Sequence, residues 1–411
     1  MSSQSDIEQS GWPLARADRR WTQLQLFVVL LVAAAATWCY IIGEYVGYYL
    51  NLKMGFAAMT AGSMIGMLLV TLAVVPAATR YGIDSIASAK PQFGNNGWLI
   101  TVFLQYASII GWNCLLLIFF GKSVAQLFVA LGLTTAESSD MVVRVVAAIA
   151  CVFVFLILLA GANGLEKVST ILFFFIVGIG LWMIYLLLTV KGADIATAKP
   201  SAASESLQWN YVTGIEIGIV SLLSWWPYIG AMVRQAPNAH NATLPAMLGM
   251  GLPVPLLSVV GLASILALQK SDPSAWFVEL GGTTYGVIAL LFVIAANLGT
   301  FLAFIGVFFA PLCGIQIVDY FLLRGQRINI RGVYQSGPGT PYEYWGGFNI
   351  VAILAMAAGF ATYLYLLNPI SYVSNSPYEY LTASLPTAVV GGLVYLIGTL
   401  AIVKPSGKGD Y

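Results

Sequence analysis

The sequence predicts an all-α protein that crosses a membrane many times, and two observations carry this prediction. First, 59% of the 411 residues are hydrophobic and only 9% are charged, whereas a soluble domain carries about 25% charged residues. Second, the charged residues are clustered, which leaves apolar runs of about 20 residues or more, long enough to span a hydrocarbon core. The formal net charge of +1 gives no reason to expect nucleic acid as a partner.

Polar breaks and breaks rich in glycine and proline divide the apolar sequence into separate spans. The predicted spans are 25–51, 56–79, 98–121, 141–161, 166–190, 211–233, 244–268, 284–323, 349–368 and 380–403. They form one transmembrane domain over 25–403, between an N-terminal tail (1–24) and a C-terminal tail (404–411). The first apolar stretch is too long for a cleaved signal peptide, so the N-terminal tail is expected in the mature protein.

Lysine and arginine gather on one side of these spans. Three arginines precede span one, namely Arg16, Arg19 and Arg20. The basic residues that follow an even-numbered span are Arg80, Lys90, Lys167, Arg234, Arg324, Arg327, Arg331, Lys404 and Lys408. The loops on the other side also contain lysines, but acidic residues dilute them. Because cytoplasmic loops carry an excess of Lys and Arg, both termini are predicted to be cytoplasmic in a multi-pass protein of the plasma membrane.

Span eight is unusually long. As one helix, the 40 residues of 284–323 would measure about 60 Å, roughly twice the hydrocarbon thickness. Two ordinary spans would place the basic cluster at 324–331 outside, against the charge rule. The segment is therefore predicted to make one net crossing, broken or steeply tilted, giving about ten crossings in all. The candidate breaks are Gly299, Gly306, Pro311 and Gly314.

Two spans contain sequences that interrupt a membrane helix. In span one, "WCYIIGEYVGYYLN" places Gly43 and Gly47 on either side of Glu44. In span six, "SLLSWWPYIGAMVR" contains Pro227 and Gly230. Broken helices are tolerated where they line a cavity. Their separation by five spans is typical of two inverted five-helix repeats, in which the substrate site lies near the midplane where both breaks meet.

Polar and aromatic groups inside the membrane are candidates for this site. The candidate substrate-binding residues are Gly43, Glu44, Trp112, Asn113, Trp225, Trp226 and Asn297. Aromatic walls and asparagine amides suit a flat, neutral heterocycle, which stacks on its faces and forms hydrogen bonds at its rim. Glu44 is also the best candidate proton carrier, because a desolvated carboxyl group can be neutral at moderate pH.

Each candidate also has a structural interpretation. Glu44 could form an interhelical hydrogen bond, and Glu216, near the outer end of span six, could face water. Trp112, Trp225 and Trp226 could pack as ordinary core residues. The tryptophans at span ends or in ordinary packing, interpreted as belt or filler residues, are Trp38, Trp98 and Trp209.

Several stretches resemble one family. They are "YYLNLKMGF" (48–56), "TRYGIDSIASAKPQFGNNGW" (79–98), "SWWPYIGAMVRQA" (224–236), "GIQIVDYFLLRGQRINIRGVY" (314–334) and "YEYWGGFNIVAILA" (342–355). The sequence is similar here to the nucleobase:cation symporters of the cytosine permease, purine permease and hydantoin transporter type. The last two stretches are the most specific of the five, and the matches spread over most of the chain.

The resemblance implies the leucine-transporter fold, with two inverted five-helix repeats followed by two further helices. It implies a substrate held between a tryptophan of span three, Trp112, and one of span six, Trp225 or Trp226, with Trp225 preferred from its spacing to Arg234. No cofactor is expected beyond a coupling ion, H⁺ or Na⁺. A sodium ion, the one metal considered, would be held by carbonyls around Ile41–Gly43 and by the hydroxyl of Thr300.

The sequence also departs from the family pattern. "VIAANLGT" resembles the first part of span eight and "FLAFIGVFFAPLCGIQIVDYF" resembles span ten, so the end of span eight and span nine are missing from the match, with the junction near Thr300–Phe301. Phe301 stands where the family has an asparagine that faces substrate. The acidic residue usual before Arg234 is replaced by "GAMV". The second repeat is therefore predicted to be truncated.

The predicted function is secondary active transport, importing a nucleobase or related heterocycle (cytosine, a purine, allantoin or a hydantoin) by cation symport with alternating access. The alternative is a transport-inactive deletion variant of such a permease. A membrane enzyme is not predicted, because the sequence contains no metal-ligand cluster, nucleophile motif or phosphate-binding loop and has a single histidine, His240. The expected partners are the heterocyclic substrate and the lipid bilayer.

Overall fold

The computed structural model describes residues 12–35, 38–135, 138–159, 161–269 and 298–411. The principal helices are α2 (Gln23–Ala34), α3 (Trp38–Gly47), α4 (Leu52–Tyr81), α5 (Ser85–Phe93), α6 (Leu99–Ala130), α7 (Ser139–Leu159), α8 (Gly161–Thr197), α9 (Leu207–Leu223), α10 (Trp226–Val233), α11 (Ala239–Gly251), α12 (Pro253–Leu268), α15 (Leu298–Ile317), α17 (Ile350–Leu366) and α19 (Ser384–Gly398). The shorter elements are η1 (Arg16–Asp18), α16 (Ile330–Val333), α18 (Tyr378–Leu381) and the π-helical turns η2 (Val318–Leu323) and η3 (Thr399–Val403). Within these ranges no β-strand occurs, so the predicted all-α class is confirmed.

Several helices are long and apolar enough to cross a membrane. In the part of the chain that the structure describes, five single helices meet this condition, or up to seven spans if each of two bent helix pairs counts as one. The predicted spans 141–161, 166–190 and 349–368 correspond to α7, α8 and α17. The chain is an integral, multi-pass membrane protein, and the total of about ten crossings stays a prediction.

The predicted break in span six is confirmed. α9 and α10 form one of the bent pairs, with an angle of 48° between them. The bend falls at Ser224 and Trp225, directly before Pro227 in the first turn of α10. Proline is tolerated in a first turn because the N–H group that it lacks has no partner within the helix there. The proline therefore starts the second half-helix.

The break in span one lies earlier than the sequence indicated. α2 and α3 are bent by 60° relative to each other between Ala34 and Trp38. Gly43 lies inside α3, so the prediction that it interrupts the helix is wrong, whereas Gly47 is the last residue of α3. A Cβ on Gly43 would overlap the Ser258 carbonyl of α12, and one on Gly47 would overlap the Ile265 side chain. These glycines allow two membrane helices to approach closely.

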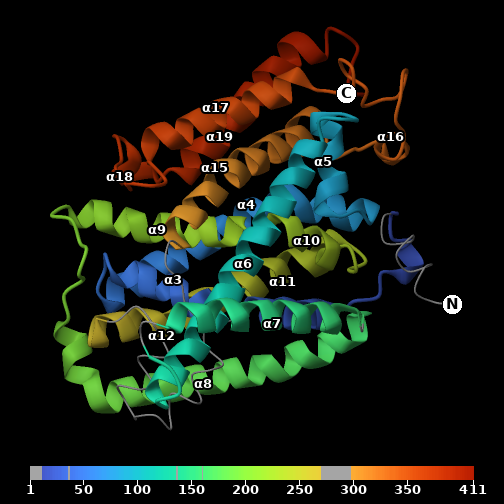
Figure 1. The fold of residues 1–411 in the computed structure, drawn as a ribbon. Helices are drawn as coiled ribbons and strands as arrows, with labels where there is room; N and C mark the ends of the chain where they lie inside the picture. The colour runs from blue at the N-terminus through green and yellow to red at the C-terminus, as the bar shows by residue number, and fades with distance from the viewer. Residues whose placement is uncertain (1–11, 36–37, 136–137, 160, 270–297) are drawn as a thin grey trace.

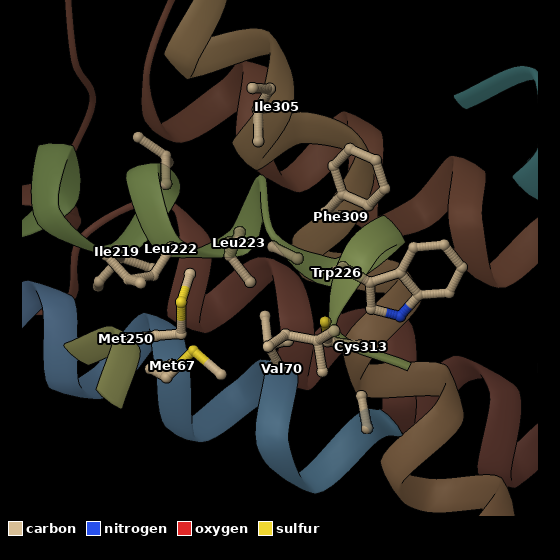
Figure 2. Packing of buried hydrophobic residues seen from close by; sticks show 14 of the residues in the cluster. Met67, Val70, Ile219, Leu222, Leu223, Trp226, Met250, Ile305, Phe309 and Cys313 are labelled. Carbon is tan, nitrogen blue, oxygen red and sulfur yellow. The ribbon is translucent and has the colours of Figure 1, made fainter. Parts of the chain in front are cut away.

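Spans one, two, six and seven pack together as a bundle. α2 packs on α11, α3 on α12, and α4 on α9. Glycines allow each close approach: Gly261 of α12 faces the Tyr40 carbonyl, and Gly62 of α4 faces Gly218 of α9. Large apolar side chains fill the space between α4, the break of span six and α15, among them Val70, Leu222 and Phe309 (Figure 2).

α15, α17 and α19 form a separate layer beside this bundle (Figure 1). The helical chain runs from Leu298 through η2 to Leu323 without interruption. Gly299, Gly306, Pro311 and Gly314 therefore do not break it, contrary to prediction. Gly314 instead meets the Ala388 carbonyl of α19, which explains a small residue there. Residues 284–297 of predicted span eight lie outside the described residues.

Candidate functional site

The two bends bring three tryptophans together. Trp225 stands at the bend of span six, Trp38 begins α3 at the bend of span one, and Trp112 lies in α6. The Trp38 ring centroid is 6.0 Å from that of Trp112, with the planes at 65°, and 6.1 Å from that of Trp225, with the planes at 44°. Tyr228 lies 5.5 Å from Trp225. We call Trp38, Trp112, Trp225 and Tyr228 the aromatic cluster.

Sequence reasoning missed two members of this cluster, Tyr228 and Trp38, and Trp38 makes more ring contacts within it. It is 6% exposed and contacts both tryptophans expected to hold the substrate. The sequence assigned it to belt or filler positions, because the break of span one was placed after it, at Gly43. A signal was present: "ATWCY" places an indole where two half-helices join, as "SWWP" does in span six.

The two adjacent tryptophans of span six, Trp225 and Trp226, contact different parts of the molecule. Trp226 is fully buried, and its Nε1 donates a hydrogen bond to Gln316 Oε1 at 2.7 Å. Its ring packs against Phe309 of α15, with 5.7 Å between centroids (Figure 2). Gln316 Nε2 in turn donates to Ser88 Oγ at 3.2 Å. Trp225 thus belongs to the aromatic cluster, while Trp226 connects α10 to α15 and α5.

A serine of α5 holds the first turn of α10. Ser85 Oγ donates to the Trp226 carbonyl oxygen at 2.6 Å and accepts from the Gly230 N–H at 3.1 Å. A Cβ on Gly230 would overlap the Ser85 backbone. Gly230 lies inside α10 and allows α5 to approach, so it adds no second break to the helix.

The two membrane glutamates have different environments. Glu44 is 4% exposed and accepts a hydrogen bond from Tyr48 Oη at 3.0 Å, one turn away. Glu216 is 2% exposed and accepts from the Ala383 and Ser384 N–H groups at 3.1 Å each and from Ser384 Oγ at 2.6 Å. It satisfies the otherwise unpaired N–H groups at the start of α19. The interpretation that Glu216 faces water is therefore wrong.

The remaining candidates are less well placed or lie outside the description. Asn113 is exposed, and its Nδ2 donates to the Ile109 carbonyl of its own helix at 2.9 Å. Ile41 and Gly43 are buried in α3. Asn297 lies outside the described residues. Thr300 belongs to α15, but the structure does not describe its side chain.

A second polar cluster joins three of the stretches on which the family resemblance rests. Asp319 is fully buried, and its Oδ2 accepts from Arg324 Nε and from Gln92 Nε2, each at 2.7 Å. Its Oδ1 accepts from Tyr395 Oη at 3.0 Å and from Tyr411 Oη at 3.1 Å. These contacts link α5 to η2 and to the C-terminal segment. Charged pairs of this kind need every hydrogen-bonding position satisfied.

Arg324 extends this cluster to the loops. Its Nη2 donates to the Pro91 carbonyl at 3.0 Å, and its Nη1 donates to the Gly409 carbonyl at 2.7 Å. Tyr344 Oη also donates to Pro91 at 2.5 Å. Burial raises the pKa of Tyr344 to about 12, so its phenol keeps the donating proton. Contacts also connect Arg19 to the end of α4 at Thr79 and Arg80, and Arg80 lies near Gln326, two residues after Arg324. We call the side of the molecule with Arg19, Arg80 and Arg324 the arginine-rich face; α5, α16 and the C-terminus lie toward this side (Figure 1).

Comparison with known proteins gives matches of one kind. A family model described as a permease for cytosine/purines, uracil, thiamine and allantoin matches residues 277–382. The purine-uracil permease NCS1 of Arabidopsis thaliana is 30% identical over 92 residues, which are 21% of this chain and 15% of the relative. The hydantoin permease of Microbacterium maritypicum is 23% identical over 374 residues, which are 74% of this chain and 73% of the relative.

Solved structures of Mhp1 have a similar fold. A closed conformation with bromovinylhydantoin bound, described as a nucleobase-cation-symport-1 family transporter, matches with a TM-score of 0.75, 19% identity and 96% coverage of both chains. An inward-facing conformation matches with a TM-score of 0.76, 18% identity and coverage of 97% of this chain and 94% of that chain. The fold is thus of the leucine-transporter class. The matches support the similarity to nucleobase:cation symporters that the motifs indicated.

Proposed function

We propose that this protein is a secondary active transporter for a nucleobase or a related flat heterocycle. The observation that carries the proposal is the meeting of two bent spans at the aromatic cluster, since paired broken helices form the substrate sites of transporters with inverted repeats. Indole rings stack on flat heterocycles and leave the rim free for polar contacts. The relatives support the same substrate class, because they are described as permeases for purines, uracil and hydantoins.

Each site residue has a proposed role. Trp112 and Trp225 stack on the substrate, while Trp226 connects α10 to α15. Glu44 carries a proton or forms a hydrogen bond to substrate, beside Gly43. Asn113 or Asn297 supplies an amide to the substrate rim, Asn113 after a change of rotamer.

The coupling ion is proposed to be H⁺ or Na⁺. Sodium would use backbone oxygens around Ile41 and Gly43 and the hydroxyl of Thr300, since oxygen donors suit a hard cation. An ion drives transport only if it favours the substrate-binding conformation over the other. We further propose that the protein lies in the plasma membrane with both termini in the cytoplasm, because Arg19, Arg80 and Arg324 share one face.

Uptake measurements test the proposal. Cells that express the chain, with membrane insertion verified, are given radiolabelled cytosine, uracil, hypoxanthine, allantoin and hydantoin. We expect uptake above the vector control for at least one compound, reduced by a proton uncoupler or by removal of sodium. Correct insertion without any uptake, combined with binding of none of the five compounds, would favour the transport-inactive deletion variant.

A further inference from the structure

A pocket of about 380 Å³ opens on the arginine-rich face, away from the aromatic cluster. It lies between the end of α4, the start of α11 and the end of η2. Arg16 and Arg80 contribute its charged groups, and Thr79, Asn238, Tyr320 and Gln326 are among its polar lining. Among the described residues that line it there is no carboxylate, so the lining carries two positive charges and no negative charge. We call it the basic pocket.

The two arginines of the basic pocket come from segments that are bonded to each other, the N-terminal segment and the end of α4. Arg19 is 7% exposed, and its Nη1 donates to the Thr79 carbonyl at 2.6 Å while its Nε donates to the Leu14 carbonyl at 2.9 Å. The Leu14 N–H donates to the Gly82 carbonyl at 2.9 Å. Arg19 thereby fastens the N-terminal segment, including η1, to the end of α4. Arg16 is consequently held beside Arg80, and both side chains are exposed to solvent.

The start of α11 adds to the positive potential of the basic pocket. Asn238 caps this 13-residue helix by accepting from the Asn241 N–H at 2.9 Å, and Ala239, its first residue, lines the pocket. The N-terminus of a helix carries a partial positive charge and favours phosphate. The two guanidinium groups and the N-terminus of α11 thus all add positive potential to the same pocket.

We propose that the basic pocket binds a phosphate monoester, with the headgroup of an anionic lipid as its natural form. Arginine is suited to phosphate because its planar donors can form paired hydrogen bonds with phosphate oxygens. A water molecule occupies about 30 Å³ in the liquid, so the pocket has room for more than one bare phosphate. α4 has 30 residues and is apolar enough to cross a membrane, so it is about 45 Å long, the thickness of a bilayer with its headgroups, and Arg80 lies in its last turn.

Such a ligand would connect separate parts of the molecule. Arg80 and Asn238 belong to the ends of two bundle helices, α4 and α11, whereas Tyr320 and Gln326 follow α15. One phosphate bound by Arg80 and Asn238 on one side and by Tyr320 and Gln326 on the other would therefore favour conformations in which the ends of α4 and α11 stay close to η2. This binding site does not depend on the proposed transport activity.

The test uses the purified full chain in nanodiscs of phosphatidylcholine. Phosphatidate is titrated in one arm and inorganic phosphate in another, and binding is followed without any heterocycle present. The variant Arg16→Gln/Arg80→Gln removes both pocket charges. The control, Arg20→Gln/Arg331→Gln, removes two exposed charges that do not line the pocket. A fluorescence melting curve verifies that both variants are folded.

We expect saturable binding of phosphatidate that weakens about tenfold, or ~1.4 kcal/mol, in the pocket variant and less than about twofold in the control. Binding of inorganic phosphate with the same dependence on Arg16 and Arg80, and equal affinity, would identify a free phosphate as the ligand of the same site. Equal weakening in both variants would show general attraction to a basic surface and overturn the proposal. So would the absence of saturable binding in both arms. None of these outcomes depends on whether the protein transports a heterocycle.

Discussion

At the scale of single residues, the aromatic cluster raises the question of what Trp38 does between the two proposed walls. Its centroid distances of 6.0 and 6.1 Å lie in the range of favourable aromatic pairs, each worth about 0.5–1.5 kcal/mol beyond buried area. If a flat substrate enters between Trp112 and Trp225 as proposed, it replaces these contacts and competes with Trp38 for the same two rings.

Replacement of this competing ring should strengthen binding. We expect Trp38→Ala to raise the affinity for the transported heterocycle about tenfold, because the substrate no longer displaces an indole. The measurement is equilibrium binding to purified protein, with Trp38→Phe as an intermediate case. A lower affinity in Trp38→Ala would show that Trp38 is a third wall of the site.

The two adjacent tryptophans of span six give a matched pair of variants. We expect Trp225→Ala to weaken substrate binding at least about tenfold, or ~1.4 kcal/mol, with little change in melting temperature, because Trp225 is only half-buried. Trp226→Phe should lower the melting temperature, because the buried Gln316 amide loses its donor. The same loss of affinity in both variants would contradict these separate roles.

At the scale of elements, the breaks show what the sequence could and could not predict. Pro227 indicated the bend of span six, since proline removes a backbone donor and has few positions in a helix. Gly43 gave the wrong position in span one, because glycine serves both to break a helix and to let two helices touch. The carbonyl of Ser258, which explains Gly43, lies 215 positions along the chain and leaves no trace near Gly43.

The link between α5 and α10 can be tested through Ser85. In Ser85→Ala, the Trp226 carbonyl and the Gly230 N–H lose a buried partner, at a cost of about 1–3 kcal/mol. We expect a lower melting temperature and a faster exchange of α10 amides for deuterium. Ser201→Ala, at an exposed position, serves as the control. Unchanged amide exchange in α10 would show that this link does not hold the half-helix.

At the scale of the whole molecule, one buried ion pair, Asp319 with Arg324, connects distant parts of the chain. The family motifs indicated the fold class and family, because "VDYFLLR" and "AKPQFG" place Asp319, Arg324 and Gln92 in a fixed order. That they meet at one buried carboxylate could not be predicted, since this requires the packing of α5 against η2. The roles of Asn297 and Thr300 stay predictions, because Asn297 and the Thr300 side chain lie outside the described part of the chain.

The ion pair supplies a comparison of buried and exposed charge. In Asp319→Asn, Arg324 is left as a buried charge without its carboxylate, which costs about 3–5 kcal/mol. We expect a large fall in melting temperature or in folded yield. Asp194→Asn breaks an exposed pair with Lys191, 3.2 Å apart, and should change stability by less than about 1 kcal/mol. Similar melting temperatures for both variants would contradict a structural role for Asp319.

The position of α5 has a mechanical consequence. One end of this nine-residue helix is bonded to α10 through Ser85, and the other end is bonded to Asp319 through Gln92. If α10 swings outward to release a ligand, it must either break both bonds of Ser85 or carry α5 with it like a lever. In the second case the motion of α5 pulls on Gln92 and, through it, on the Asp319–Arg324 pair. Binding at the aromatic cluster would then change the geometry of this ion pair at the other end of α5.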